Sequence, residues 1–184
     1  MTERIFIAGF GGQGAILAGK LICLAAMHEG KNISHIPSYG VEMRGGAANC
    51  SVVVSDEDIP SPLVFKPDVL VTLNEQSLSK FIDRLRPDGL LVYNSSLIHT
   101  TPSRKDITVV AVDANDIAEG LGSSRAANMV LIGAVAGLKP EIASVESVIS
   151  ELGKAVSTRN LELNELNKKA LFAGKEAVLT KAKK

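Results

Sequence analysis

The sequence predicts a single α/β domain over residues 1–184, with a Rossmann-like, mostly parallel sheet, helices on both faces and a helical C-terminal part. Three observations indicate this fold. An apolar run at Ile5–Ala8 leads through a glycine-rich turn into a helical pattern, which is typical of a buried parallel strand and its crossover helix. Short apolar runs then alternate with helical segments of about ten residues. No internal repeat or low-complexity linker divides the chain.

The first strand and helix are joined by the pattern Gly9-x-Gly11-x-x-Gly14. Glycines allow a tight turn and a close approach of backbones, because no β-carbon stands in the way. The first amides of the following helix have no intrahelical partner and can hold an anion. The pattern matches the dinucleotide-binding fingerprint in its strand-to-helix context. The candidate binding turn comprises Gly9, Gly11, Gly12, Gln13 and Gly14.

These glycines alone do not establish a nucleotide site, because they equally fit close packing of a helix on a strand. In the dinucleotide fold, an acidic residue follows about 20 residues later and binds the ribose. Here the second strand, expected at Asn32–Pro37, has no acid at its tip; Glu29 precedes it and Glu42 comes well after it. The sequence therefore disfavours an ordinary NAD-binding domain.

The remaining elements follow from the same periodicities. The run 48–55 is β-branched and follows the second strand too closely for a helical crossover, so we expect it to be antiparallel to its neighbour. Further strands are expected at 68–73, 90–94 and 107–113. Helices are expected from Asn74 or Ser77 to Leu85, and at 116–121, 126–136, 145–157 and 161–181.

Composition limits the classes of partner. Hydrophobic residues make up 46% and charged residues 22% of the chain, which is the balance of a globular protein. The formal net charge is zero, so charge gives no reason to expect nucleic acid or an anionic membrane as a partner. No apolar run has the length of a membrane span and no signal-peptide pattern precedes the first strand. We therefore expect a cytoplasmic protein.

The number and spacing of the cysteines and histidines do not predict a metal site. Cys23 and Cys50 are too few and too far apart for an iron–sulfur or zinc motif, so both are expected to be core residues. His28, His35 and His99 are scattered without ligand spacing.

A second polar stretch follows the second predicted strand, at the sheet edge where ligands of doubly wound folds bind. It can be read as an internally salt-bridged turn, or as a loop that contacts a ligand or a partner. Tyr and Arg are enriched among interface anchors, and Arg offers a planar fork for carboxylate or phosphate. The candidate residues in it are Tyr39, Gly40, Glu42, Arg44, Gly45 and Gly46.

Four segments together resemble the gamma subunit of the 2-oxoacid:ferredoxin oxidoreductases. They are GFGGQG at 9–14, SYGVEMRGG at 38–46, SDEDIPSP at 55–62 and Ala127-Asn128-Met129. The resemblance runs from about Ile5 to Gly137. It implies a Rossmann-like component of a complex that decarboxylates a 2-oxoacid oxidatively, transfers the acyl group to coenzyme A and passes electrons to ferredoxin or a similar acceptor.

The resemblance also implies that the chemistry lies mainly outside this chain, which carries no catalytic residue of its own. Thiamine pyrophosphate would be held by alpha and beta subunits, and iron–sulfur clusters by beta or delta components. The two loops would face these partners, near the place where the co-substrate coenzyme A must approach. Asn128 would cap a helix or touch a partner. A surface left exposed without its partners would also suit a homodimer of the isolated subunit.

The second loop resembles the 2-oxoglutarate type more than the pyruvate type, which tends to carry Arg-Arg-Gly-Ala there. Branched-chain and indolepyruvate enzymes remain open, and Val41 stands where many relatives have proline. Two other classes also remain: a free-standing Rossmann-type enzyme that binds NAD or flavin, and an assembly module whose glycine turn binds no ligand.

Overall fold

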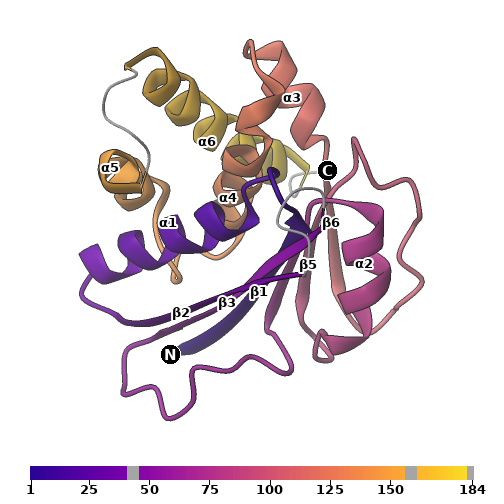
Figure 1. Ribbon diagram of the computed structural model, residues 1–184, viewed down its shortest axis with the longest axis vertical. Helices are drawn as coiled ribbons and strands as arrows, with labels where there is room; N and C mark the ends of the chain where they lie inside the picture. Colours follow the sequence, from indigo (N-terminus) through magenta and orange to yellow (C-terminus); the bar gives the residue numbers. More distant parts are fainter. Residues whose placement is uncertain (41–45, 156–160, 182–184) are drawn as a thin grey trace.

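The computed structural model of the chain is described here for residues 1–40, 46–155 and 161–181. Its centre is a twisted six-stranded sheet in the order β2-β3-β1-β4-β5-β6 (Figure 1). The strands are β1 (Thr2–Phe10), β2 (Asn32–Tyr39), β3 (Ala47–Ser55), β4 (Val69–Thr72), β5 (Leu90–Asn94) and β6 (Thr108–Val112).

One strand of this sheet runs against the others. β3 pairs antiparallel with both β1 and β2, whereas β1, β4, β5 and β6 pair in parallel. The predicted mostly parallel sheet with one antiparallel strand is confirmed. The position of β3 was not predicted: it separates β2 from β1 by two strand spacings, about 10 Å. In the dinucleotide-binding fold the second strand lies directly beside the first.

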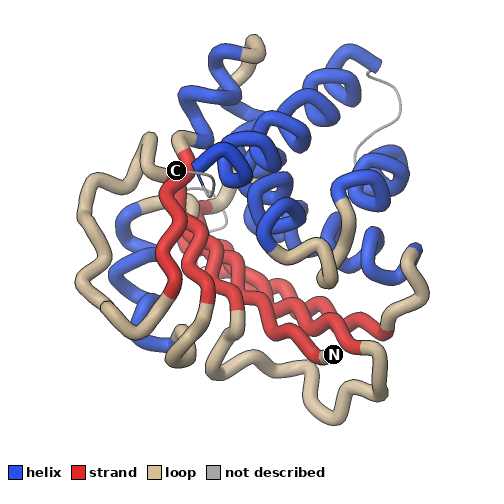
Figure 2. Tube along the Cα trace, turned by 180° about the vertical axis from the view of Figure 1, so that it is seen from behind, coloured by secondary structure: helices blue, strands red, loops and turns tan. Residues whose placement is uncertain are grey.

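The helices cover the two faces unequally. They are α1 (Ala15–His28), α2 (Glu75–Phe81), α3 (Ala114–Gly120), α4 (Ala127–Leu138), α5 (Val145–Ala155) and α6 (Leu161–Lys181), with 3₁₀ turns η1 (Ile82–Arg84) and η2 (Ser124–Ala126). Figures 1 and 2 show α1, α4, α5 and α6 stacked on one side of the sheet, while α2 lies on the other.

Each face of the sheet has its own hydrophobic core. Because side chains alternate along a strand, Ile5 and Ile7 of β1 join the large core beneath α1 and α4. Phe6 and Ala8 join the smaller core beneath α2, where the Phe6 and Phe81 rings lie 4.8 Å apart. The continuous apolar run of β1 therefore has the predicted cause, burial on both faces.

The observed ends of several helices differ from the predicted ends. Asn74 caps α2 as predicted, since its side chain accepts a hydrogen bond of 2.9 Å from the Ser77 amide. The helix ends at Phe81 rather than Leu85, because the chain tightens into η1. α3 starts two residues earlier than predicted, at Ala114, and α5 is described only to Ala155. In the described residues, no helix is both long and apolar enough to cross a membrane.

The loop after α1 is fastened to the start of α5 by Glu29. Its carboxylate accepts hydrogen bonds from the Ser144 amide at 2.8 Å, the Ser144 hydroxyl at 2.7 Å and Lys31 Nζ at 2.8 Å. Partial burial alone would raise the pKa of Glu29, but the hydrogen bonds from Lys31, Ser144 and Ser147 outweigh it and lower the pKa to about 2.

We expect Glu29→Gln to lower the melting temperature at pH 7, and to lower it less as the pH falls. A depressed folded-state pKa gives stability that is fully present above the unfolded pKa, near 4.5, and is lost as the pH falls toward about 2. Thermal melts of both proteins between pH 7 and pH 2 measure this, with Glu119→Gln on α3 as an exposed-carboxylate control. A melting difference that stays constant over this range would contradict the assignment.

Candidate functional site

The turn between β1 and α1 requires glycine at two positions for different reasons. Gly12 has φ +100° and Gly14 φ +79°, conformations that side-chain-bearing residues rarely adopt. At Gly12 a β-carbon would meet nothing within 4 Å, so glycine is needed there only for the backbone conformation. At Gly14 a β-carbon would also lie 2.4 Å from Asn128 Nδ2, so the turn and α4 are in direct contact there.

Gln13 fixes this turn to the end of β4. Its Oε1 accepts hydrogen bonds of 2.7 Å from both the Phe10 amide and Asn74 Nδ2, and its Nε2 donates to the Leu73 carbonyl at 3.4 Å. Sequence reasoning placed Gln13 among the ligand-binding residues. In the structure its side chain holds the turn through these three hydrogen bonds, and a role in ligand binding stays a prediction.

Asn128 is the second residue of α4 and 5% exposed. Its Nδ2 lies 3.4 Å from the Gly14 carbonyl, to which it donates, and its Oδ1 accepts from the Met129 amide at 3.0 Å. Of the two roles expected for Asn128, that of helix cap is wrong, since the N-cap position belongs to Ala126, and contact with a partner stays a prediction. Instead, Asn128 ties the start of α4 to the glycine turn.

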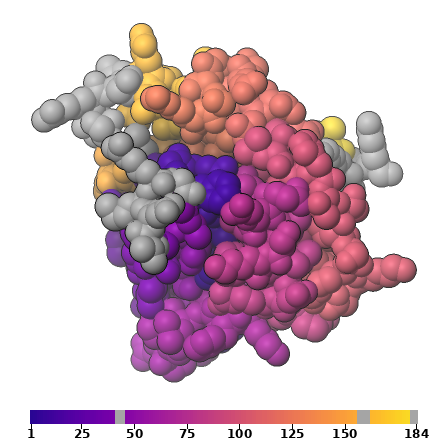
Figure 3. Space-filling model, turned by 45° about the vertical axis from the view of Figure 1, so that its right-hand side comes forward, coloured from indigo at the N-terminus to yellow at the C-terminus, as the bar shows by residue number. Residues whose placement is uncertain are grey.

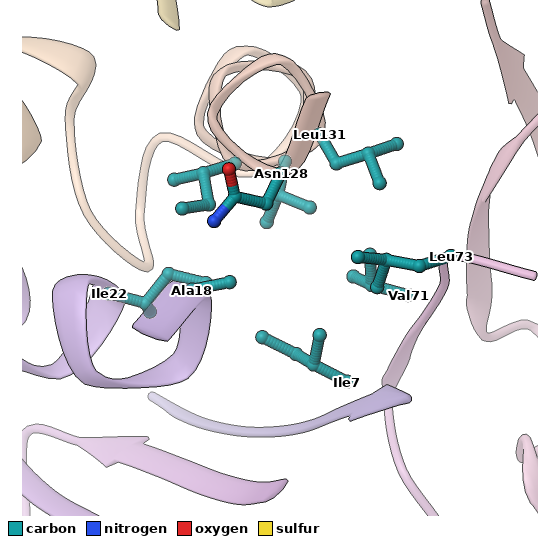
Figure 4. Close-up of a pocket in the computed structure, with 9 residues that line it drawn as sticks. Ile7, Ala18, Ile22, Val71, Leu73, Asn128 and Leu131 are labelled. Carbon is teal, nitrogen blue, oxygen red and sulfur yellow. The ribbon is translucent and has the colours of Figure 1, made fainter. Parts of the chain in front are cut away.

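Figure 4 shows Asn128 at the end of a gap enclosed by apolar side chains of β1, α1, β4 and α4. The gap has a volume of about 10 Å³, which is close to the minimum for one water molecule. It is a packing gap rather than a cofactor site.

The two stretches predicted from the sequence meet in space. The Gly11 amide donates a hydrogen bond of 2.8 Å to the Gly46 carbonyl, and the Gly40 amide donates to Ala47 at 2.7 Å. Tyr39 ends β2 beside them and is 58% exposed. Glu42, Arg44 and Gly45 lie outside the described residues. The structure thus brings together the glycine turn and both ends of the second stretch.

Two clefts flank the glycine turn, and Gly12 lines both. The Tyr39 cleft, of about 240 Å³, lies over the first turn of α1 and is lined by Phe10, Gly11, Gly12, Gly14, Ala15, Ile16, Leu17, Tyr39 and Ala48. The amide cleft, of about 200 Å³, is lined by Gly12, Gln13, Leu73, Asn94, Leu97, Asn115, Ser124, Arg125, Ala127 and Asn128. In Figure 3 the indigo N-terminal segment reaches the surface beside magenta and salmon-coloured segments.

Sequence reasoning missed the polar residues of the amide cleft. Asn94 is the last residue of β5, and its Nδ2 donates a 2.8 Å hydrogen bond to Asn115 Oδ1 on α3. The available signal was an asparagine at the carboxyl end of a buried strand, the edge where open α/β sheets bind ligands. Arg125 carried no such signal, because only the fold brings η2 to this edge.

The cysteines have the structural role predicted for them. Cys23 and Cys50 are buried, and burial raises the pKa of each thiol to about 12, so both stay protonated and unreactive near neutral pH. Among residues 1–40, 46–155 and 161–181, no three His, Cys, Asp or Glu side chains are grouped to hold a metal ion.

Comparison with known proteins gives the family. The model of the family described as pyruvate ferredoxin/flavodoxin oxidoreductase matches residues 4–177. The chain belongs to this family. Among solved structures, it is similar to the keto/oxoacid ferredoxin oxidoreductase gamma subunit from Geobacter sulfurreducens, with 32% identity and a TM-score of 0.80 over 97% of this chain and 99% of that one. The predicted family and gamma-subunit fold are confirmed.

Curated relatives of this oxidoreductase chain carry different substrate names. The 2-oxoglutarate synthase subunit KorC of Methanocaldococcus jannaschii is 36% identical over 88% of this chain and 89% of its own length. The ketoisovalerate oxidoreductase subunit VorA of Methanothermobacter thermautotrophicus is 42% identical over 73% of this chain. The chain spans only 28% of that VorA and 35% of a second one, so the same domain occurs both as a separate chain and within longer subunits.

Proposed function

We propose that the chain is the gamma subunit of a thiamine pyrophosphate-dependent 2-oxoacid:ferredoxin oxidoreductase complex. One observation supports this proposal most strongly. The Gly11–Gly46 hydrogen bond joins the two stretches that resemble the family, the glycine turn and the stretch after β2, into one exposed surface. The surface has a cleft walled by the exposed side chain of Tyr39, which suits contact with a co-substrate held between subunits. We assign thiamine pyrophosphate and the iron–sulfur clusters to alpha, beta or delta partners.

Coenzyme A is the co-substrate that this surface would face. The first turn of α1 contains no acidic residue, and its N-cap, Gly14, has no side chain to satisfy the free amides. Such a helix start favours a phosphate group. The chain would therefore contribute a phosphate-binding surface, while acyl transfer takes place on groups of the partner subunits.

A free-standing NAD or flavin enzyme is a weaker alternative. Because β3 lies between β1 and β2, an acidic residue at the tip of β2 would be about 10 Å from β1 and poorly placed for a ribose bound at the glycine turn. We favour 2-oxoglutarate as the substrate, since the KorC relatives match this chain nearly end to end. Ketoisovalerate is the second candidate, because the VorA subunits reach up to 42% identity.

We expect Tyr39→Ala to raise the KM for coenzyme A of the assembled complex several-fold without preventing assembly. The reason is that the exposed ring walls the Tyr39 cleft beside the first turn of α1. Co-purification and steady-state kinetics of the complex measure both effects, with Phe172→Ala on α6 as a control at another exposed aromatic. Failed assembly would instead assign Tyr39 to the subunit interface, and an unchanged complex would remove it from the site.

A further inference from the structure

The helix α1 is apolar on the side that faces solvent as well as on the side that faces the sheet. Its sequence contains no acidic residue, and its only basic residues are Lys20 and His28. A helix that is apolar all round is normally buried on every side. In Figure 1, α1 lies over the strands at one edge of the sheet; α4 and α5 contact it within the helical layer. Its outer side is nevertheless partly or fully exposed.

The outer side of α1 carries one continuous stripe, which we call the α1 stripe. It consists of Leu17, Lys20, Leu24 and Met27. Met27 is 54% exposed, Lys20 is exposed, and both leucines are partly exposed. The spacing of three, four and three residues is the one by which a helix packs along a second helix. At about 1.5 Å per residue the stripe is roughly 15 Å long, which suits contact with about three turns of another helix.

The α1 stripe is continuous with the Tyr39 cleft. Leu17 belongs to the stripe and also lines that cleft, together with Tyr39. A protein that covers the stripe would therefore also border the cleft proposed to face the co-substrate. This continuity favours a partner of the same assembly as the occupant of the stripe.

The charge of Lys20 distinguishes a different protein from a second copy of this chain. Lys20 lies near the middle of the stripe and forms no ion pair with any residue at 1–40, 46–155 or 161–181. A two-fold contact uses the same patch on both chains, so it would bring the two Lys20 side chains together. Like charges that face each other oppose association. A carboxylate supplied by a different chain would instead complement Lys20.

We propose that the α1 stripe docks a helix of a partner subunit, whose apolar side carries a carboxylate opposite Lys20. Leu17, Leu24 and Met27 pack against the apolar side chains of that helix, and the ion pair of Lys20 fixes its register. The proposal rests on the proposed function only for the identity of the partner, a subunit of the same oxidoreductase complex.

Two chemical probes test this contact in the assembly purified with the chain at native abundance. Peroxide oxidises exposed methionines to sulfoxides, and the rate at Met27 is expected to fall at least tenfold relative to the isolated chain. Met129, which is 2% exposed, gives the rate of a buried methionine in the same sample. Coupling by a zero-length carbodiimide should join Lys20 to an Asp or Glu of the partner, which mass spectrometry of the joined peptides identifies.

Two exposed-site variants measure the strength of the contact. Lys20→Glu is expected to reduce the recovery of partner subunits at least tenfold, and Met27→Gln several-fold. Lys66→Glu is the matched charge reversal at another exposed lysine, and Leu179→Gln replaces an exposed apolar side chain on α6. Both controls should leave the recovery unchanged.

Oxidation of Met27 in the assembly as fast as in the isolated chain, or normal recovery of partners by Lys20→Glu, would overturn the proposal. Protection of Met27 by a second copy of the chain would overturn the choice of occupant. If subunits of alpha and beta type are recovered while Met27 stays open, the docking assignment fails and the proposed function stands. If Met27 is protected and Lys20 is coupled in an assembly of different composition, the docking assignment stands and the proposed function fails.

Discussion

Gly174→Ala is expected to lower the free energy of unfolding by about 3 kcal/mol or more, the upper end of overpacking costs. The β-carbon of the new residue would lie 1.9 Å from the Val130 carbonyl oxygen and 3.0 Å from the Ala134 amide nitrogen. Both are backbone atoms of α4, so no side chain can rotate away to make room. α4 and α6 would have to separate along their whole contact, which lies over the large core.

Denaturant unfolding followed by circular dichroism measures this effect. Gly120→Ala on α3 is the matched control, because a β-carbon there meets nothing within 4 Å. Alanine at that helical position should be neutral or stabilising by up to about 1 kcal/mol. Similar stability changes for the two variants would contradict the close packing of α4 on α6. Gly133→Ala should resemble Gly174→Ala, since its β-carbon would lie 2.0 Å from the Leu171 carbonyl oxygen.

Gly14→Ala is expected to destabilise the protein by about 2–3 kcal/mol and to displace the glycine turn. About 1–2 kcal/mol comes from placing alanine at φ +79°. The rest comes from contact with Asn128 Nδ2, 2.4 Å from the added β-carbon. Displacement of the turn should also reduce co-purification of partner subunits, because the turn contributes to the proposed surface.

A double-mutant cycle separates the two contributions. Asn128→Ala removes the clashing amide, so the double variant should be more stable than the sum of the single changes predicts, by about 1–2 kcal/mol. The backbone strain remains in both backgrounds. Unfolding free energies of the four proteins give the coupling. Strict additivity would show that Asn128 does not contact the turn in solution.

The sequence was sufficient for elements whose cause is local. The apolar run of β1, the glycine turn, the Asn74 cap and the single antiparallel strand follow from periodicity, turn chemistry and loop length. The order of strands was not predictable in this way. Whether β3 pairs with β2 alone or inserts beside β1 depends on long-range packing, which no short segment specifies.

The candidate site, like the fold, was predicted only in part. The two stretches predicted to form it do meet, through Gly11 and Gly46. The contacts of Gln13 with Asn74 and of Asn128 with Gly14 were not predicted, because these partners are distant in sequence. Asn94, Asn115 and Arg125 were missed, since each is ordinary in its own segment and only the fold brings them to one cleft.

We expect this chain to act as a gamma subunit within a larger oxidoreductase. Affinity purification of the chain at native abundance, followed by an assay of 2-oxoacid-dependent viologen reduction in the eluate, tests this role most directly. We expect partners of alpha and beta type, and activity that requires thiamine pyrophosphate and coenzyme A, with 2-oxoglutarate the preferred substrate. A chain that is recovered alone with bound NAD or flavin would contradict the role as a gamma subunit.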